Sequence, residues 1–551
     1  MIANALSPGR ALPQVWNGER ALAASLVGIL LLQASLVATR AINWDEYFYY
    51  SEVWAFAQEG TLNRAIQTLH VRLFGWVTFL PGDTVDHIRI ARIFMFGCEL
   101  VTLGSIFAIA RRFGSREAAI ICALAYVSFG YVIQHGFAFR TDPIATAALA
   151  LSLAIFACKD LRARNLLLIA LPAAFAFAIT IKSVLWAPAF AAMAFRYWQD
   201  ADYSSEKALR ILGLGLLTGA AALVLIVLHG LDVPAVQASD TGASVGNAAD
   251  KMFSLSVNPY WKFFGKGLLI GLPTFVMVAA SLILIARGSV SKPWLFALLL
   301  SPLACLVFYQ NTLPYFYVFM MAPVCAGLVP AAEWLSKNRK GVLVAVAMFA
   351  NAAAVVAVDD RSTLARQKEV HAAERAMFER PVKYFDFPDM FARQDKANGF
   401  MTAWGLDGYL RSGEPFFTRQ LQEQQVPLVV ENGTMWTSLL RERGPAREFH
   451  PVDAEVLRDT FIHAWGPFWL AGWQSDTPAT IRWKIRVPGE YEVLEGKIEL
   501  DGKPYDTGDR LYLDRGPVTV RSTTVPAKLI WAEGVSVPET AEPELSLWTL
   551  F

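Results

Sequence analysis

The sequence RAINWDEYFYY, Arg40 to Tyr50, directly follows the first long apolar run of the chain. It places two adjacent carboxylates, Asp45 and Glu46, among several aromatic rings. Ionisable groups at membrane depth cost roughly 2.5 to 3.5 kcal/mol each on insertion scales, so they are usually paired, hydrated or functional. Two interpretations are compatible with the pattern: Asp45 caps a helix that begins near Glu46, or the acids face a cavity and take part in chemistry.

The composition of the chain is that of a polytopic membrane protein. Of its 551 residues, 55% are hydrophobic and only 18% are charged, and the mean hydropathy is +0.37. Soluble domains are less apolar and carry about 25% charged residues. The net charge of +1, without basic clusters outside short loops, argues against nucleic acid as a partner. The five cysteines lie in or beside apolar runs and show no disulfide or zinc spacing.

The apolar stretches predict the fold class. We expect a polytopic α-helical membrane protein, because a helix that crosses a bilayer needs about 20 apolar residues. About eleven stretches approach this length, at residues 21–39, 93–110, 118–134, 143–158, 165–181, 183–197, 209–229, 267–286, 293–310, 314–332 and 341–357. The first of them lacks a small-residue cleavage site, so we interpret it as an uncleaved span.

Basic loops predict how these spans are oriented. Three short loops between apolar stretches are rich in arginine and lysine, at residues 111–116, 159–164 and 337–340. By the positive-inside rule these loops and the N-terminus are cytoplasmic. The other connections then lie outside, at residues 40–92, 135–142, near 182, 230–266 and after 358. We therefore expect an integral protein of the bacterial inner membrane with a periplasmic active site and C-terminal region.

Three regions follow from the hydropathy profile. Residues 1–357 form the predicted transmembrane catalytic domain, and residues 40–92 within it form an amphipathic first outer loop at the interface. Residues 358–475 combine helical and strand-like patterns, which predicts a mixed α/β region outside the membrane. Residues 476–551 alternate apolar and polar residues between turns such as DGK and TGD, a pattern typical of a small β-sandwich.

Three further charged residues are expected at the same outer level as Asp45. In HGFAFRTDPIATAALA, residues 135–150, Asp142 and the following proline are typical of a helix start, so Asp142 has a capping role as an alternative to a catalytic one. Arg140 lies beside the hydrocarbon and needs an anion, either a carboxylate such as Asp45 or a phosphate. Lys182, in ITIKSVLWAPAF, either extends its charge to the interface or binds the same phosphate.

Aromatic and histidine side chains supply the remaining candidates. We expect Tyr47, Tyr50, Trp54 and His70 to bind lipid or sugar. The histidines on this side lack helical i, i+4 spacing and a matching carboxylate, so no metal ligands are assigned. A divalent cation is the one cofactor that the pattern leaves open. Arg92, by contrast, is expected to belong to a group of charges that solvates a loop and anchors the second span.

The order of these elements resembles that of the type C glycosyltransferases. An uncleaved first span is followed by WDEYFYYSEVWAFAQEG, LHVRLFGWVTFLPGDTVDHIRIARIFMFG, a span closed by ARRFG, and FRTDPIATAALAL. TIKSVLWAPAF is similar to the lysine-glycine-proline stretch of the branch that holds the protein O-mannosyltransferases and the lipid A aminoarabinose transferases. YQNTLPYFYVFMMAP is similar to the arginine-tyrosine-leucine-proline segment of that branch. The resemblance covers roughly residues 20–335.

The resemblance implies a donor sugar carried on a polyprenyl phosphate and transfer at the outer face to a lipid, glycan or protein. The family's acid of the first outer loop falls on Asp45, with Glu46 beside it. Its second acid falls on Asp142, and its lysine falls on Lys182. We expect an inverting displacement in which Asp45 accepts the proton of the acceptor hydroxyl, while Arg140 and Lys182 stabilise the departing phosphate. Glu46 and Asp142 would orient the acceptor or tune the base.

Two other functions share parts of this pattern. An oligosaccharide ligase or polymerase that uses a lipid-linked chain would employ the same chemistry with a larger donor. A lipid or sugar transporter, such as a flippase, would place its charges along a pathway at mid-membrane. In this sequence the charges cluster at one outer face, and Glu99 is the main charge near the centre of a span. The pattern therefore favours a transferase over a transporter.

Overall fold

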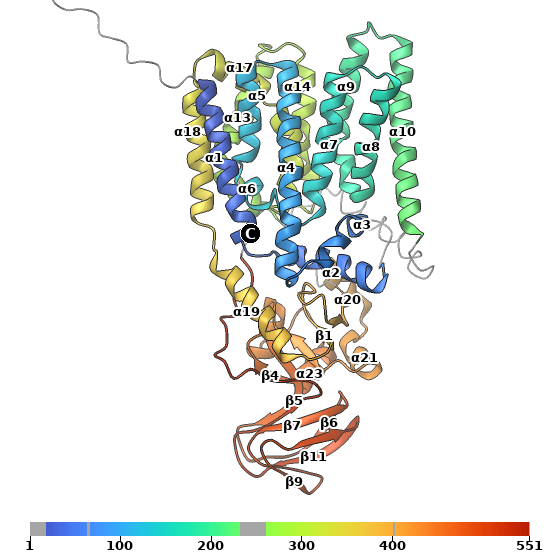
Figure 1. The fold of residues 1–551 in the computed structure, drawn as a ribbon, viewed down its shortest axis with the longest axis vertical. Helices are drawn as coiled ribbons and strands as arrows, with labels where there is room; N and C mark the ends of the chain where they lie inside the picture. Colours follow the sequence, from blue (N-terminus) through green and yellow to red (C-terminus); the bar gives the residue numbers. More distant parts are fainter. Residues whose placement is uncertain (1–17, 63–66, 232–259, 400–402, 550–551) are drawn as a thin grey trace, which may run out of the picture.

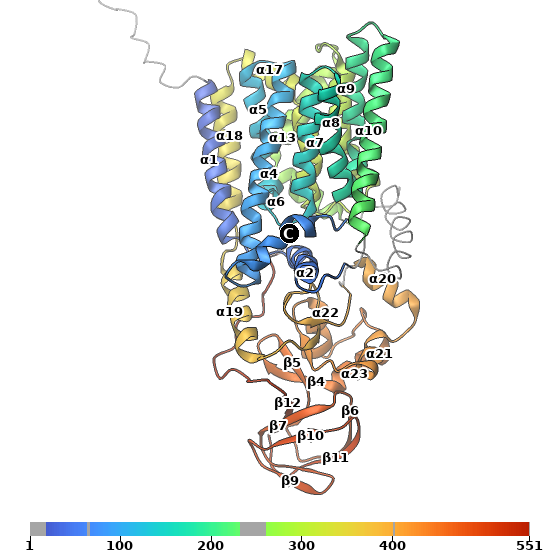
Figure 2. The ribbon, with the colours of Figure 1, turned by 45° about the vertical axis from the view of Figure 1, so that its right-hand side comes forward.

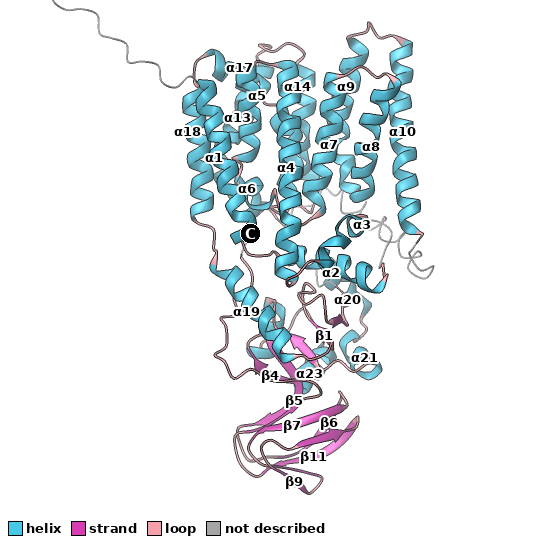
Figure 3. Ribbon diagram, in the orientation of Figure 1, coloured by secondary structure: helices cyan, strands magenta, loops and turns pink. Residues whose placement is uncertain are grey.

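The chain forms a helical bundle that is joined to a β-rich C-terminal part. The structure, a computed structural model, describes residues 18–62, 67–231, 260–399 and 403–549. The long helices lie side by side at one end of the molecule, and the C-terminal part extends from the other end of these helices (Figure 1). Every described strand belongs to the C-terminal part (Figure 3). The predicted fold class, a polytopic α-helical membrane protein with a C-terminal β-rich region, is confirmed.

Helices cover all of the predicted apolar stretches. In chain order they are α1 (Gly18–Thr39), α4 (Thr84–Phe113), α5 (Arg116–Val127) with α6 (Gly130–His135), α7 (Thr141–Cys158), α8 (Ala163–Ile179), η2 (Ile181–Trp186) with α9 (Ala187–Gln199), α10 (Ser205–Gly230), α12 (Trp261–Ile270) with α13 (Leu272–Ala286), α14 (Pro293–Leu300) through η3 (Ser301–Ala304) to α15 (Cys305–Phe308), α16 (Phe316–Ala326) with α17 (Val329–Lys337), and α18 (Gly341–Ala357).

Several of these stretches are broken or short, so the number of spans is lower by strict criteria. Within the described ranges, five helices are long and apolar enough to cross a membrane alone, and two bent pairs raise the number to seven. One pair, α12 and α13, bends by 94° around Gly271. A Cβ at Gly271 would lie 2.1 Å from the ring of Phe129, so only glycine allows this close approach. The count of about eleven spans therefore stays a prediction.

The two ends of the bundle differ in charge. The three basic loops lie at the end away from the C-terminal part, where α4, α7 and α17 end (Figure 2). At this end Arg116, at the start of α5, pairs with Glu19 of α1 at 3.1 Å. The asymmetry is the one that the positive-inside rule describes. The assignment of this end to the cytoplasm stays a prediction.

The first outer loop covers the opposite end of the bundle. It contains α2 (Trp44–Glu59), α3 (His70–Phe74) and η1 (Gly75–Phe79). A capping box starts α2: the Asn43 side chain accepts a hydrogen bond from the Asp45 amide, and the Glu46 carboxylate accepts one from the Asn43 amide at 2.9 Å. The prediction that Asp45 caps this helix is wrong, because Asn43 occupies the N-cap and the Asp45 carboxylate makes other contacts.

The C-terminal part begins with α19 (Ser362–Met377) and contains two sheets. Its remaining helices are α20 (Ala403–Ser412), α21 (Phe416–Glu423), α22 (Thr434–Trp436), η4 (Thr437–Arg441) and α23 (Pro451–Thr460). The larger sheet contains β1 (Lys383–Phe385), β2 (Asp395–Lys396), β3 (Leu428–Val430), β4 (Phe461–Trp465), β5 (Phe468–Ser475), β7 (Gly489–Glu495), β10 (Arg510–Leu513) and β12 (Ala527–Trp531). The smaller sheet contains β6 (Thr480–Ile485), β8 (Ile498–Leu500), β9 (Lys503–Tyr505) and β11 (Gly516–Ser522).

The larger sheet is continuous across the predicted boundary between residues 475 and 476. Its strand order is β10-β7-β12-β5-β3-β1-β2, and β4 also pairs with β5. β5 pairs antiparallel with β3 of the mixed region and with β12 of the β-rich region. The two predicted regions therefore share the hydrogen-bond ladder of one sheet.

The C-terminal segment returns to the helix bundle and holds α2 in place. The Gln367 amide of α19 donates hydrogen bonds to the Ile42 carbonyl at 2.8 Å and to the Leu547 carbonyl at 2.9 Å. Trp548 packs edge-on against Trp44 and Tyr47 of α2, at centroid distances of 6.2 and 5.7 Å. The end of the described chain thus lies beside the start of α2. One face of α2 is covered by protein as a result.

His371 of α19 provides a pH test of this contact. Its buried ring stacks on the ring of Tyr47 at 5.6 Å, and burial lowers the pKa of His371 from 6.5 to about 4. Between these values the unfolded chain binds more protons than the folded chain, so stability falls as the pH drops, by up to about 3 kcal/mol. We expect purified protein to unfold more readily at pH 4.5 than at pH 7, and His371→Phe to reduce this difference. An equal pH dependence in the variant would contradict the role of His371.

Candidate active site

Neighbouring residues at the start of α2 point in different directions, because each residue turns an α-helix by about 100°. The Asp45 side chain faces the start of α7, where it meets Arg140. Glu46 faces α4, and Tyr47 faces α19. The two adjacent carboxylates of the sequence therefore belong to different environments.

Four of the predicted charged residues form one chain of ion pairs. Arg140 pairs closely with Asp45, and its Nε lies 3.4 Å from Oδ2 of Asp142. Lys182 pairs with Oδ1, the other carboxylate oxygen of Asp142. Arg140 and Asp142 are buried, whereas the side chains of Asp45 and Lys182 are 13% and 11% exposed. The two ends of the chain of ion pairs, Asp45 and Lys182, are therefore slightly more exposed than its middle.

Breaks between helices bring these charges together. Arg140 is the N-cap residue of α7 and has an extended backbone, which separates α6 from α7. Thr180 is also extended, so α8 ends before Lys182 and the short helix η2 presents the lysine. Asp142 lies in the first turn of α7, and the alternative in which it is the N-cap is wrong, because the helix begins at Thr141, two residues earlier than expected, with Arg140 as its N-cap. Its carboxylate binds Arg140 and Lys182.

Two tyrosines enclose the central arginine of this chain. The Arg140 guanidinium lies 3.4 Å from the ring centroid of Tyr315 and 5.5 Å from that of Tyr49. The Lys182 ammonium lies 5.8 Å from the Tyr315 ring. Cation–π contacts of this kind contribute about 0.5 to 2 kcal/mol, most where water is excluded. Tyr315 therefore contributes to stabilising both cations.

Glu46 is fully occupied by structural contacts. Its two oxygens accept hydrogen bonds from Arg92 at 2.7 and 2.6 Å, and its Oε1 also accepts one from the Phe139 amide at 2.8 Å. Arg92 donates further bonds to the carbonyls of Arg40 and Ala41, at 2.8 Å each. The expectation that Arg92 solvates a loop is wrong: it is 1% exposed and ties the start of α2 to α4. Its partner is distant in sequence, so local pattern could not reveal the pair.

The predicted aromatic residues of α2 lie away from the ion pairs. Tyr47 stacks on His371, and Tyr50 is hydrogen-bonded through its hydroxyl to Nδ1 of His87 at 2.5 Å. Trp54 packs against Tyr50 at a centroid distance of 6.5 Å. These three rings lie on the faces of α2 that meet α4 and the C-terminal part. Their contact with substrate stays a prediction.

His70 lies next to the site through Tyr49. Its buried ring packs edge-on against the Tyr49 ring at 5.1 Å, and its Nε2 lies 3.5 Å from a carboxylate oxygen of Glu52. The Tyr49 hydroxyl in turn lies 3.5 Å from that of Thr141, beside the ion pairs. His70 thus supports the ring that faces Arg140. A direct role of His70 in substrate binding stays a prediction.

The carboxylates of Asp45 and Glu46 differ in pKa because their environments differ. Burial raises the pKa of Asp45, and the positive charge of Arg140 only partly opposes this. Burial also disfavours the charged form of Glu46, but Arg92 and the amides of Asn43 and Phe139 outweigh it and lower the pKa of Glu46. Glu46 is therefore held as an anion, and Asp45 is the more basic carboxylate of the two.

The divalent cation that the sequence left open finds no ready site. Among the residues that the structure describes, no group of three or more His, Cys, Asp or Glu side chains could hold a metal ion.

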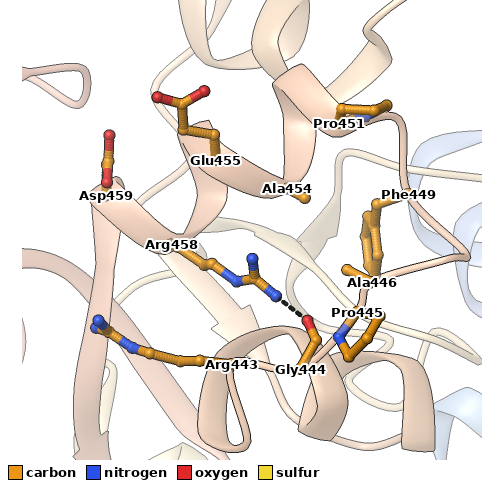
Figure 4. Close-up of a pocket in the computed structure, with 10 residues that line it drawn as sticks. All are labelled: Arg443, Gly444, Pro445, Ala446, Phe449, Pro451, Ala454, Glu455, Arg458 and Asp459. Atoms are coloured by element: carbon orange, nitrogen blue, oxygen red, sulfur yellow. Dashed lines mark hydrogen bonds between the residues drawn. The ribbon is translucent and has the colours of Figure 1, made fainter.

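A cavity of about 500 Å³ lies in the C-terminal part, between residues 443–449 and α23 (Figure 4). There Arg458 donates a hydrogen bond to the Gly444 carbonyl. None of the residues predicted for the reaction lines this cavity, so it lies outside the candidate active site.

Tyr49 and Tyr315 are the site residues that sequence reasoning missed. Tyr49 follows Asp45 by four residues, so the helical period places both on one face of α2 and could have selected it over Tyr47 or Tyr50. Tyr315 lies in the segment YQNTLPYFYVFMMAP, whose likeness to a family segment was noted without a role for this ring. Its contact with Arg140 joins parts of the chain that no local pattern connects.

Comparison with known proteins shows the fold. No protein-family model matches the sequence, and no curated protein matches it by sequence. Two solved structures of ArnT from Cupriavidus metallidurans, one bound to undecaprenyl phosphate and one in the apo state, match with TM-scores of 0.54 and 0.53. Each is 12% identical, and the match covers 76% of this chain and 94% of ArnT. The resemblance seen in the sequence is confirmed for the three-dimensional fold.

We predict that Glu46 is needed for folding. Glu46→Gln should lower the free energy of unfolding by about 3 to 5 kcal/mol, because it leaves the buried Arg92 guanidinium without its carboxylate. Glu59→Gln, on an exposed residue of the same helix, should change it by no more than about 0.5 kcal/mol. Denaturant unfolding of both variants in detergent measures the difference. Equal stability of the two variants would refute the structural role of Glu46.

Proposed function

We propose that this chain, which has the fold of the type C glycosyltransferases, is a membrane glycosyltransferase that moves a sugar from a polyprenyl-phosphate donor to an acceptor outside the cytoplasm. The chain of ion pairs through Asp45, Arg140, Asp142 and Lys182 carries the proposal. It combines a partly accessible carboxylate with two cations at the end of a helix bundle. A base and a phosphate-binding pair are the groups that such a transfer requires.

In this mechanism the donor phosphate replaces Asp45 as the partner of Arg140 and binds Lys182 as well. Arg140 and Lys182 bind the phosphate and stabilise the charge that develops as its bond to the anomeric carbon breaks. Asp45, released from Arg140, accepts the proton of the acceptor hydroxyl as the new bond to the anomeric carbon forms on the opposite face of the sugar. Burial raises the pKa of Asp45, which favours this role as a base. Asp142 keeps the two cations in place.

An apolar groove beside the site supports a lipid-linked donor. It encloses about 380 Å³ and is lined mainly by aromatic and aliphatic side chains of α12, α13, η3 and α15. Val307 and Trp261 in this groove are 68% and 70% exposed, as expected for side chains that face hydrocarbon. Thr312 lines the groove and precedes Tyr315, which contacts Arg140, by three residues in the sequence. A prenyl chain in this groove would place its phosphate near the cations. The ArnT structure with bound undecaprenyl phosphate is consistent with this class of donor.

Asp45→Asn tests the proposed base. The variant keeps the shape of the side chain but cannot take up a proton, so we expect transfer to fall by about 10² to 10⁴. Purified protein reconstituted into membranes would be incubated with a panel of polyprenyl-phosphate sugars and acceptors, with and without chelator. Formation of the transfer product would then be measured. Glu59→Gln is the control and should retain activity. Activity of folded Asp45→Asn near that of the wild type would refute the assignment, and no transfer by the wild type with any donor would refute the function.

Tyr315 provides a separate test of phosphate binding. Tyr315→Leu removes the ring beneath Arg140, so we expect the donor KM to rise about three- to tenfold, in line with the strength of a cation–π contact. Tyr315→Phe keeps the ring and should stay within about twofold of the wild type. Steady-state kinetics at varied donor concentration distinguish the two. Equal effects of both variants would show that the hydroxyl, and not the ring, is important.

A further inference from the structure

A polar cavity of about 520 Å³ lies at the other end of the bundle. It is formed where α4, α7 and α9 end and where α8 and α10 begin, away from the C-terminal part (Figure 2). Five basic side chains line it: Arg112, Lys159, Arg162, Arg196 and Lys207. Asp160 and Asp200 are the two carboxylates in its wall. The wall is therefore strongly positive.

Arg196 is the buried residue of this wall. It is 6% exposed, and its guanidinium donates one hydrogen bond to the Ala157 carbonyl at 3.1 Å and lies 3.6 Å from Asp200. Its Nε has no hydrogen-bond partner among the described residues. A buried charged donor that stays unpaired is unfavourable, so a ligand that accepts a hydrogen bond from it is favoured.

The basic residues around Arg196 are not neutralised by protein. Within the described part of the chain, no carboxylate lies within 4 Å of the Arg112, Lys159 or Arg162 side chains. Asp200, the partner of Arg196, also pairs with Lys292, so its charge is shared between two cations. Arg112, Lys159 and Arg162 are exposed, so an anion that approaches the cavity can reach them.

We infer that this cavity binds a phosphate group, supplied by the headgroup of an anionic phospholipid in the adjacent leaflet. Arginine guanidinium and lysine ammonium groups donate hydrogen bonds to phosphate oxygens. Basic pockets between helices at a membrane surface are therefore suited to bind anionic headgroups. The first turns of α10 expose Leu209, Leu212 and Leu216, which can contact the acyl chains. The bound lipid joins the ends of five helices. This site is independent of the proposed transfer reaction.

The test compares two double variants of the full chain that remove equal charge from the same loops. Arg112→Gln with Arg162→Gln changes the cavity, and Arg111→Gln with Arg164→Gln changes exposed residues outside its wall. Native mass spectrometry in neutral detergent would measure binding of phosphatidylglycerol, with phosphatidylcholine and inorganic phosphate as comparisons. We expect the cavity pair to weaken phosphatidylglycerol binding about tenfold, and the control pair by less than about threefold.

The comparison ligands identify the source of the phosphate. Binding of phosphatidylglycerol that depends on the cavity pair supports a lipid headgroup. Binding of inorganic phosphate but not of phosphatidylglycerol, weakened by the same cavity pair, supports the site with a soluble anion as its ligand. Equal effects of the two variant pairs, or no anion binding by the wild type, would overturn the inference. Arg196→Gln provides a further variant, and its unfolding temperature without lipid shows whether it folds.

Discussion

The candidate site depends on one buried guanidinium, that of Arg140, which forms ion pairs with two carboxylates. Its charge could not be buried alone, because an unpaired ion in a medium of low dielectric constant costs several kcal/mol. Asp45 and Asp142 therefore hold it, and Lys182 balances the second acid. Since these residues come from α2, α7 and η2, the same ion pairs fix the relative positions of three segments. Stability and the proposed chemistry thus rest on the same charges.

The adjacent acids of α2 illustrate how a helix divides two tasks between neighbouring residues. Glu46 is bound on all sides by Arg92 and backbone amides and anchors the helix to α4. Asp45, one residue earlier, is held by the cation that a substrate phosphate would attract. The anchor keeps the helix still while the other acid changes partner. In the proposed mechanism Asp45, which accepts a proton, is therefore held in position by Glu46, which stays charged.

Sequence alone predicted much of the fold and part of the site. The apolar stretches and the alternating C-terminal pattern identified the helices and the β-rich region, because hydrophobic periodicity is local. Asp45, Arg140 and Lys182 were placed together by topology. The role of Arg92 was misjudged and the contact of Tyr47 with His371 was not foreseen, since the neighbours of both residues are set by contacts between distant segments. The boundary at residue 475 falls at the end of a strand whose partners lie on both sides of it.

The contact of Trp548 with Trp44 has a consequence for biosynthesis. Helix α2 emerges early from the ribosome, but the ring that packs on its first residue is made much later. During synthesis the start of α2 therefore stays uncovered until the C-terminal part has been made, has folded and has returned to the bundle. Final assembly of the region around Asp45 is thus coupled to synthesis of the segment that contains Trp548. A nascent or truncated chain would contain the charged residues of the site with α2 still uncovered on that face.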